Sequence, residues 1–349
     1  MARRTRNSLW TGAFQRAFGS LARSGLRAGT KVLKQAVVAP ATARRQAAGA
    51  GLLAPKSGRR GLKDCVTGMA LSAGGVRRYF LYKPPGVVPS ERLPLLVMLH
   101  GCGQDANAFA MSTRMNRVAA RERFLVLYPE QDRLANPQRC WNWFETRSRQ
   151  AYGEAAIVLA AIDQACLLYP VDRDRIAIAG MSAGASMAAL VATRYPERFK
   201  AVVMHSGVPP GVADSAASAI GAMRGHREPP APAGASVWPS LLVIQGTRDR
   251  VVAAVNGAAA ARHWASAAGA DAVSVRKVQR GARRPMTVTE FKSDGKAAAT
   301  LCEVDGLGHA WSGGAVGQRF SDEQGPDASR MVWAFISRRF GAAAIPPEG

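Results

Sequence analysis

Short apolar segments alternate with segments of helical periodicity from about residue 66 onward, and this alternation limits the folds open to the chain. The segments 95–99, 124–128, 201–204 and 241–244 contain only aliphatic, sulfur-containing or aromatic residues. Strands that are buried on both faces read as such continuous apolar runs, because helices cover both sides of a parallel sheet. We therefore predict the α/β class, with a mostly parallel central sheet and helices on both faces.

Further strands and helices are predicted on either side of these runs. Residues 66–71 and 77–82 alternate around a Gly-containing turn, which predicts a hairpin. Residues 206–240 are rich in Ala, Gly and Pro and are predicted to form a loop or a small lid. The remaining predicted elements are strands at 175–179 and 298–304 and helices at 154–168, 183–194 and 328–339. Ligands bind at the carboxyl ends of parallel strands, so the residues that follow these strands are the candidates for chemistry.

Residues 1–62 differ from the rest of the chain in charge. They hold 13 Lys and Arg and no acidic residue, which is more than half of the formal net charge of +23. The spacing of apolar residues predicts a basic amphipathic helix, followed by a linker at 39–61. The apolar face of that helix carries Trp10, Phe14, Ala17, Phe18 and Leu21, and Arg16, Arg23 and Arg27 lie opposite. The predicted organisation is a basic amphipathic extension and linker at 1–62 and one domain at 63–342.

Several roles are open to this extension. It could anchor the chain at an apolar boundary, form a basic tail, dock on the domain as a helix, or serve as an organelle transit peptide. A secretory signal is not predicted, because Arg residues interrupt the apolar ones. We expect no binding to nucleic acid, since no aromatic platform or groove-reading motif accompanies the charge.

The cysteine pattern argues against a metal scaffold. Cys65, Cys102, Cys140, Cys166 and Cys302 are scattered and form no C-x-x-C pair. A structural zinc site is therefore not expected. No run approaches the ~18–20 uninterrupted apolar residues of a membrane-spanning helix, so a membrane span is not expected either.

A candidate nucleophile lies between a predicted strand and a predicted helix. The sequence G-M-S-A-G at 180–184 follows the strand 175–179. A serine at such a sharp turn projects its hydroxyl from the sheet edge, and the two glycines remove side chains that would collide there. The N–H of Ala183 would point at the oxygen of a bound carbonyl, and the helix dipole would add to its effect. We predict Ser182 as the nucleophile, an ordinary Gly/Ser turn being the alternative.

A serine needs a base, and two histidines lie in the right part of the chain. His263 belongs to an Ala-rich helical stretch, where a surface or packed histidine is the simpler interpretation. His309 lies in a Gly-containing loop that follows the last predicted strand. We therefore predict His309 as the base.

The base in turn needs a carboxylate that orients its ring. Asp249 follows the predicted strand 241–244 closely, whereas Asp271 and Asp294 lie in less regular segments. Asp305 is only four residues from His309 and is expected to shape the turn. We predict Asp249 as the orienting acid.

A second oxyanion donor is expected in the sequence H-G-C-G-Q at 100–104, which follows the strand 95–99. The N–H of Cys102 is the candidate, together with that of Ala183. The Cys102 thiol is not predicted as a nucleophile, because its one candidate histidine partner, His100, is expected to point elsewhere in a loop of this type.

Taken together, these segments resemble the polyhydroxybutyrate-depolymerase-like esterases, α/β-hydrolases related to feruloyl and acetylxylan esterases. The resemblance extends over about 66–340 and rests on five motifs in order. They are H-G-C-G-Q at 100–104, C-W-N-W-F at 140–144, G-M-S-A-G at 180–184, G-T-R-D at 246–249 and G-H-A-W-S-G-G at 308–314. The resemblance implies an α/β-hydrolase fold, a catalytic domain at 63–342, and a triad of Ser182, Asp249 and His309.

It also implies a disulfide. In relatives the Cys of the H-G-C loop can bridge to the Cys before the W-x-W motif, which here implies Cys102 and Cys140. Such a bridge needs an oxidising compartment. Because no secretory signal is predicted, reduced thiols remain an equal alternative.

Other residues of these motifs are implied as parts of the substrate site. Trp141, Trp143 and Trp311 resemble pocket walls that would contact an apolar acyl or polyester chain, with burial in the core as the alternative for each. Tyr152 and Glu154 are implied to close the site.

The expected function is that of a serine carboxylic-ester hydrolase acting on short-chain 3-hydroxyalkanoate polyesters or their oligomers, with no cofactor or metal. A feruloyl or acetyl esterase acting on polysaccharide-linked or small esters is the alternative, and a non-catalytic granule-surface protein is less favoured. With no signal peptide recognised, we expect a cytoplasmic protein. The amphipathic extension could attach it to a polyester granule or a membrane surface, and the oligomeric state stays open.

Overall fold

The computed structural model describes residues 62, 64–232, 237–270 and 272–341. The predicted amphipathic helix and linker of the extension 1–62 lie outside the described residues, apart from Leu62. The last residue of the predicted domain, 342, lies outside them as well.

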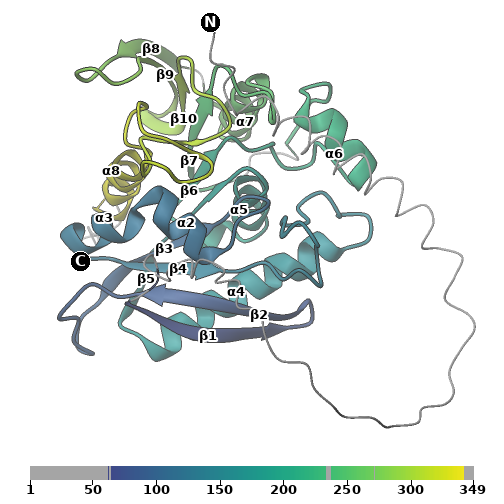
Figure 1. Cartoon of the computed structure of the whole chain (residues 1–349). Coiled ribbons are helices and arrows are strands. Elements are labelled where there is room, and N and C mark those ends of the chain that lie inside the picture. The colour runs from purple at the N-terminus through teal and green to yellow at the C-terminus, as the bar shows by residue number, and fades with distance from the viewer. Residues whose placement is uncertain (1–61, 63, 233–236, 271, 342–349) are drawn as a thin grey trace, which may run out of the picture. The chain divides into compact units, whose positions relative to one another are not determined.

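A ten-stranded sheet forms the centre of the described part of the chain (Figure 1). Its strand order is β1-β2-β4-β3-β5-β6-β7-β10-β9-β8. The strands are β1 (Cys65–Ser72), β2 (Gly75–Tyr82), β3 (Leu93–Leu99), β4 (Leu125–Pro129), β5 (Val171–Met181), β6 (Ala201–His205), β7 (Ser240–Gly246), β8 (Ala272–Val278), β9 (Met286–Ser293) and β10 (Lys296–Val304). A separate parallel pair is formed by β11 (Trp311–Ser312) and β12 (Ser321–Asp322).

The six central strands run parallel, and antiparallel pairs close both edges. β4, β3, β5, β6, β7 and β10 pair in parallel with their neighbours. β1 and β2 add one antiparallel edge, and β9 and β8 add the other. Because the central strands are parallel, the carboxyl ends of β3, β5, β6, β7 and β10 lie side by side at one end of the strands. Ligands bind at this end in such folds.

Helices cover both faces of this sheet, as Figure 1 shows. One face is covered by α4 (Gln150–Leu168), α5 (Ala183–Arg194) and α7 (Val255–Ala267), and the other by α2 (Ala106–Thr113), α3 (Met115–Glu122) and α8 (Ala328–Gly341). The predicted α/β class and the predicted arrangement of layers are confirmed. Among the described residues, α4 is the one helix long and apolar enough to cross a membrane. It packs against β1 and β2, so its length and composition are weak evidence for a span.

The central strands form because they can bury both faces. All seven residues of β3 and all five residues of β4 and β6 are buried. The core between the sheet and α2, α3 and α8 includes Phe109, Phe124 and Trp311. Burial of a large apolar side chain stabilises a fold by about 1.5–3 kcal/mol, so these apolar runs are stable only when covered on both sides.

Two predicted loop regions contain regular structure. The predicted lid at 206–240 includes the helix α6 (Ala216–Met223), which begins with a capping box between Ser215 and Ser218. The strands β8 and β9 occupy most of 272–293; Asp271 lies outside the described residues, and Asp294 lies in the turn between β9 and β10, a less regular position as expected. β8 lies at the sheet edge and β9 lies between it and β10, and most residues of both strands are exposed or half-buried. Their mixture of polar and apolar residues is a weaker pattern than the apolar runs of the centre.

Candidate active site

The predicted nucleophile, acid and base all follow carboxyl ends of the parallel strands. Ser182 follows β5 directly, Asp249 lies three residues after β7, and His309 lies five residues after β10. β6 separates β5 from β7, and β10 pairs with β7. Three segments that are far apart in sequence therefore converge on one edge of the sheet.

Ser182 occupies a strained turn between β5 and α5. Its backbone has φ 57° and ψ −123°, a conformation that residues with a Cβ rarely adopt. A Cβ on Gly180 would lie 2.3 Å from the Gly184 carbonyl, and a Cβ on Gly184 would lie 2.1 Å from the Leu99 carbonyl oxygen. Only glycine fits at both positions, so the G-x-S-x-G spacing allows the helix to pack this closely on β5 and β3. The Ser182 hydroxyl has no hydrogen-bond partner among the described residues.

Asp249 and His309 are in direct contact. The His309 Nδ1 atom lies 2.8 Å from Asp249 Oδ2, and both side chains are largely buried. The N–H groups of Val251 and Val252 each donate to Asp249 Oδ1 at 2.9 Å. Since an ionised carboxylate only accepts, His309 Nδ1–H is the donor and its Nε2 is free to act as a base.

The environment of Asp249 favours its ionised form. Burial raises the pKa of Asp249, but the nearby His309 ring and the N–H donors of Val252 and Val251 lower it by more. The net pKa of Asp249 is therefore below its ordinary value. The carboxylate is therefore charged near neutral pH and can stabilise an imidazolium. The structure thus brings the predicted acid and base together. Contacts between a catalytic serine and its base often tighten only when substrate binds, and the assignment of Ser182 stays a prediction.

The loop at 100–104 lies against the candidate nucleophile. A Cβ on Gly101 would lie 3.4 Å from the Ser182 Cβ. The N–H groups of Cys102 and Ala183 have no hydrogen-bond partner among the described residues, as an oxyanion hole requires of its donors before substrate binds. The structure contains the disulfide between Cys102 and Cys140 that the resemblance implies.

The tryptophans implied as pocket walls differ in exposure. Trp141 and Trp311 are both 0% exposed, so neither offers surface to a substrate. Trp311 packs in the core, where its Nε1–H donates to Ser329 Oγ at 3.1 Å. This burial favours the core alternative for Trp141 and Trp311, and their implied role as pocket walls stays an untested prediction. Trp143 is 6% exposed and stays a candidate.

The two residues implied to close the site differ in their surroundings, and their implied role stays a prediction. Glu154 is 1% exposed, so its carboxylate offers almost no surface to a substrate. Tyr152 packs its ring against the guanidinium of Arg194, 4.4 Å from the ring centre.

Sequence reasoning missed His205, the last residue of β6. Its carbonyl accepts the Ser182 N–H at 2.9 Å, and its Nε2 accepts the Ser312 N–H at 3.1 Å. The ring stacks on Trp311 with 4.9 Å between centres. Burial, with a smaller effect of His309, lowers the pKa of His205 to about 3, so the ring stays neutral. His205 thus links the turn that holds Ser182 to the segment that follows His309. The sequence signal that could have identified His205 is its position at the carboxyl end of a predicted strand.

No group of three or more His, Cys, Asp or Glu side chains that could hold a metal ion is found in the part of the chain that the structure describes. The arrangement at this end of the strands offers a candidate nucleophile, a candidate base in contact with its acid, and two backbone N–H groups without a partner among the described residues.

Comparison with known proteins agrees with this geometry. Residues 77–284 match the family described as Esterase PHB depolymerase. Poly(3-hydroxyalkanoate) depolymerase C of Paucimonas lemoignei is 33% identical over 150 residues, 43% of this chain and 36% of that protein. Poly(3-hydroxybutyrate) depolymerase of Ralstonia pickettii is 25% identical over 274 residues, which cover 71% of this chain and 54% of that protein. Feruloyl esterase B of Neurospora crassa is 30% identical over 144 residues, which cover 41% of this chain and 48% of that protein. The chain spans about half the length of these relatives or less.

Solved structures share the fold at low sequence identity. The acetyl xylan esterase from Aspergillus awamori superposes with a TM-score of 0.58 at 17% identity, covering 70% of this chain and 94% of that one. Esterase 2 of Thermogutta terrifontis in its apo form superposes with a TM-score of 0.51 at 14% identity, covering 82% of this chain and 98% of that one. These similarities support the α/β-hydrolase fold.

Proposed function

The chain belongs to the Esterase PHB depolymerase family, and on this premise we propose that it is a serine hydrolase of carboxylic esters. The observation that carries the proposal is the His309–Asp249 contact at the same end of the parallel strands as Ser182, whose strained turn lies against a loop with a free backbone donor. The residues of the site can carry out each step of ester hydrolysis.

In the proposed mechanism Ser182 Oγ attacks the ester carbonyl while His309 Nε2 takes its proton. The N–H groups of Cys102 and Ala183 donate to the oxyanion, and Asp249 stabilises the imidazolium without taking the proton. His309 then protonates the leaving alcohol, which leaves an acyl group on Ser182. A water molecule, deprotonated by His309, cleaves that acyl-enzyme.

Loss of the nucleophile tests this mechanism directly. Ser182→Ala should abolish turnover of p-nitrophenyl butyrate and labelling by a fluorophosphonate, because both need the hydroxyl. The wild type should show both activities. Turnover or labelling retained by a folded Ser182→Ala variant would contradict the mechanism, and a wild type with neither would contradict the enzymatic proposal.

For the substrate, we propose short-chain 3-hydroxyalkanoate polyesters or their oligomers. The names of two relatives, both poly(3-hydroxyalkanoate)-type depolymerases, support this choice. Feruloyl esterase B and acetylxylan esterase are relatives as well, which supports feruloyl or acetyl esters as the second candidate. Release of 3-hydroxybutyrate from amorphous polyhydroxybutyrate, with Ser182→Ala as the blank, separates the two. Turnover of p-nitrophenyl butyrate without release would favour the small-ester reading.

We also propose a cytoplasmic location in which the extension 1–62 binds a polyester granule. The support is its sequence pattern of apolar and Arg residues. A chain that lacks 1–62 should then sediment with granules less than the full chain does, and equal sedimentation would contradict the proposal. Disulfides persist mainly in oxidising compartments, so a cytoplasmic location predicts that Cys102 and Cys140, which are bonded in the structure, can be trapped in cells as free thiols. An intact disulfide in cells would contradict that location.

A further inference from the structure

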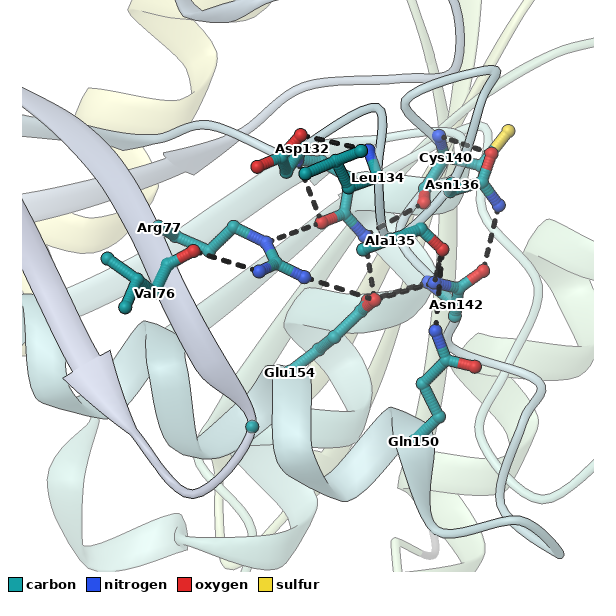
Figure 2. A network of polar contacts seen from close by, with 12 residues as sticks. Val76, Arg77, Asp132, Leu134, Ala135, Asn136, Cys140, Asn142, Gln150 and Glu154 are labelled. Atoms are coloured by element: carbon teal, nitrogen blue, oxygen red, sulfur yellow. Dashed lines mark hydrogen bonds and ion pairs between the residues drawn. The ribbon is translucent and has the colours of Figure 1, made fainter. Parts of the chain in front are cut away.

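The buried carboxylate of Glu154 on α4 accepts several hydrogen bonds (Figure 2). Glu154 Oε2 accepts the backbone N–H of Asn142 at 2.8 Å. Glu154 Oε1 accepts the Asn142 side-chain amide at 2.6 Å and the Gln131 side-chain amide at 2.8 Å. Arg77 Nη2 lies 4.0 Å from the same oxygen. Glu154 therefore joins α4 to β2, which carries Arg77, and to the segment 131–142.

Gln131, just beyond the end of β4, uses both ends of its amide in this network. Its Nε2 also donates to the Cys140 carbonyl at 3.0 Å, and its Oε1 accepts from Arg77 Nε at 2.8 Å. Asn142 Oδ1 in turn accepts from Asn136 Nδ2 at 2.8 Å. Figure 2 shows Arg77 and Asn142 directed toward the Glu154 carboxylate and Asn136 directed toward Asn142. The segment 131–142 is thus held against α4 by buried polar contacts.

The same segment holds the loop 100–104 at three points. The Gln131 backbone N–H donates to His100 Nε2 at 3.1 Å. Cys102 is bonded to Cys140, and the Gly103 N–H donates to the Gln138 carbonyl at 2.8 Å. Any shift of the segment 131–142 must therefore move the backbone that carries the Cys102 N–H.

We propose that Glu154 is a positioning residue for the oxyanion hole: it holds the segment 131–142, which in turn holds the Cys102 N–H at its distance from Ser182. The inference rests on the proposed function, since it gives the loop 100–104 the role of an oxyanion donor. Glu154 itself does not touch the reacting atoms.

The chemistry of the carboxylate explains why this position needs an acid. An ionised carboxylate only accepts hydrogen bonds, and every neighbour of Glu154 in the network presents a donor to it. A glutamine of the same shape would turn an NH₂ group toward one of these donors. Burial of a donor without a partner then displaces the segment or costs stability.

The test compares Glu154→Gln with the matched control Asp172→Asn in the full chain. Asp172 is a largely buried carboxylate that accepts from Arg175 Nε at 2.7 Å and from the Asp174 N–H at 3.1 Å. It lies at the start of β5, at the opposite edge of the sheet from Ser182. Both substitutions remove a buried acceptor, but only Glu154→Gln affects the segment 131–142.

For each variant, kcat and KM are measured with p-nitrophenyl butyrate, together with the inhibition constant of butylboronic acid, whose tetrahedral adduct occupies the oxyanion hole. Loss of one oxyanion donor costs about 10²–10³-fold in kcat, and a displaced donor should cost less. We expect Glu154→Gln to lower kcat by about 10-fold or more, to weaken boronic acid binding by a similar factor, and to change KM less than about twofold. Asp172→Asn should leave all three within about twofold.

Three results would overturn the inference. The first is a folded Glu154→Gln variant with wild-type kcat, and the second is an equal loss of kcat in Asp172→Asn. If Glu154→Gln does not fold, Glu154→Asp replaces it, because aspartate keeps the charge but has a shorter side chain. The same loss of kcat is then expected. A Glu154→Asp variant with wild-type kcat is the third result. A wild type without esterase activity would overturn the proposed function itself, which distinguishes that failure from the other three.

Discussion

The disulfide between Cys102 and Cys140 should make a large and measurable contribution to stability. The two residues are 38 positions apart in sequence. In the chain-entropy model, closing a loop of that length removes about 13 cal/mol/K from the unfolded state, or about 3.9 kcal/mol at 25 °C. Breaking the bond should therefore destabilise the domain by that amount.

The expected shift in melting temperature follows from the size of the domain. Residues 62–341 form roughly 280 positions, and an unfolding entropy of about 2.1 cal/mol/K per residue gives about 0.59 kcal/mol/K for the whole domain. The melting temperature should then fall by about 7 °C on reduction. Thermal unfolding followed by circular dichroism, with and without dithiothreitol, measures this shift.

Two variants make the experiment specific. Cys140→Ser should melt at least about 7 °C below the oxidised wild type and should not respond to dithiothreitol. Cys166 forms no disulfide and is partly exposed, so Cys166→Ser should keep both the wild-type melting temperature and the response to reductant. A wild type whose melting temperature changes by less than about 2 °C on complete reduction would refute the reasoning.

Three further predictions concern the candidate site. Asp249→Asn should lower kcat by about 10⁴-fold with the fold intact, because His309 would lose the acceptor that fixes its ring, and a loss below about tenfold would contradict the assignment. Gly184→Ala should abolish activity and lower the urea midpoint, because its Cβ would lie 2.1 Å from the Leu99 carbonyl oxygen; an unchanged midpoint would exclude the clash. The third prediction concerns pH. The pKa of an unfolded histidine is about 6.5, whereas the pKa of His205 in the folded protein is about 3. Between pH 6.5 and pH 3 the imidazole of residue 205 therefore binds a proton only in the unfolded state. The contribution of His205 is complete above about pH 6.5 and declines by about 1.4 kcal/mol per pH unit as the pH falls toward 3. Urea unfolding from pH 7 to 4 should show a shallower decline for His205→Gln, and equal slopes would contradict the prediction.

The central sheet could be predicted because its strands have an unambiguous sequence pattern. Continuous apolar runs are possible only where both faces are covered, and β3, β4, β6 and β7 were all recognised in this way. The edge strand β8 and its neighbour β9 are more exposed than the central strands and mixed in composition, so no apolar run marks them. The helix α6 is short and surrounded by Ala, Gly and Pro, and its capping box was the available signal.

For the site, the sequence identified residues that are defined by position after a strand. Asp249 and His309 could be chosen because each follows a strand in a short loop, and the structure puts them in contact. Trp141 and Trp311 could not be placed, because a tryptophan beside a motif has the same sequence signature whether it lines a pocket or fills the core. The role of Glu154 depends on contacts with Gln131 and Asn142, which no local pattern encodes.

The position of β10 beside β7 has a consequence for the order in which the protein is made. The ribosome synthesises β5 with Ser182 first and β7 with Asp249 next, and His309 follows 60 residues after Asp249. At 5–20 residues per second, translation of that interval takes about 3–12 s. During this time the nascent chain holds the proposed nucleophile and acid but not the base, and the edge of β7 is still unpaired. Ester cleavage would thus begin only after β10 is translated and paired, and the uncovered β7 edge is where a nascent chain is most exposed to aggregation.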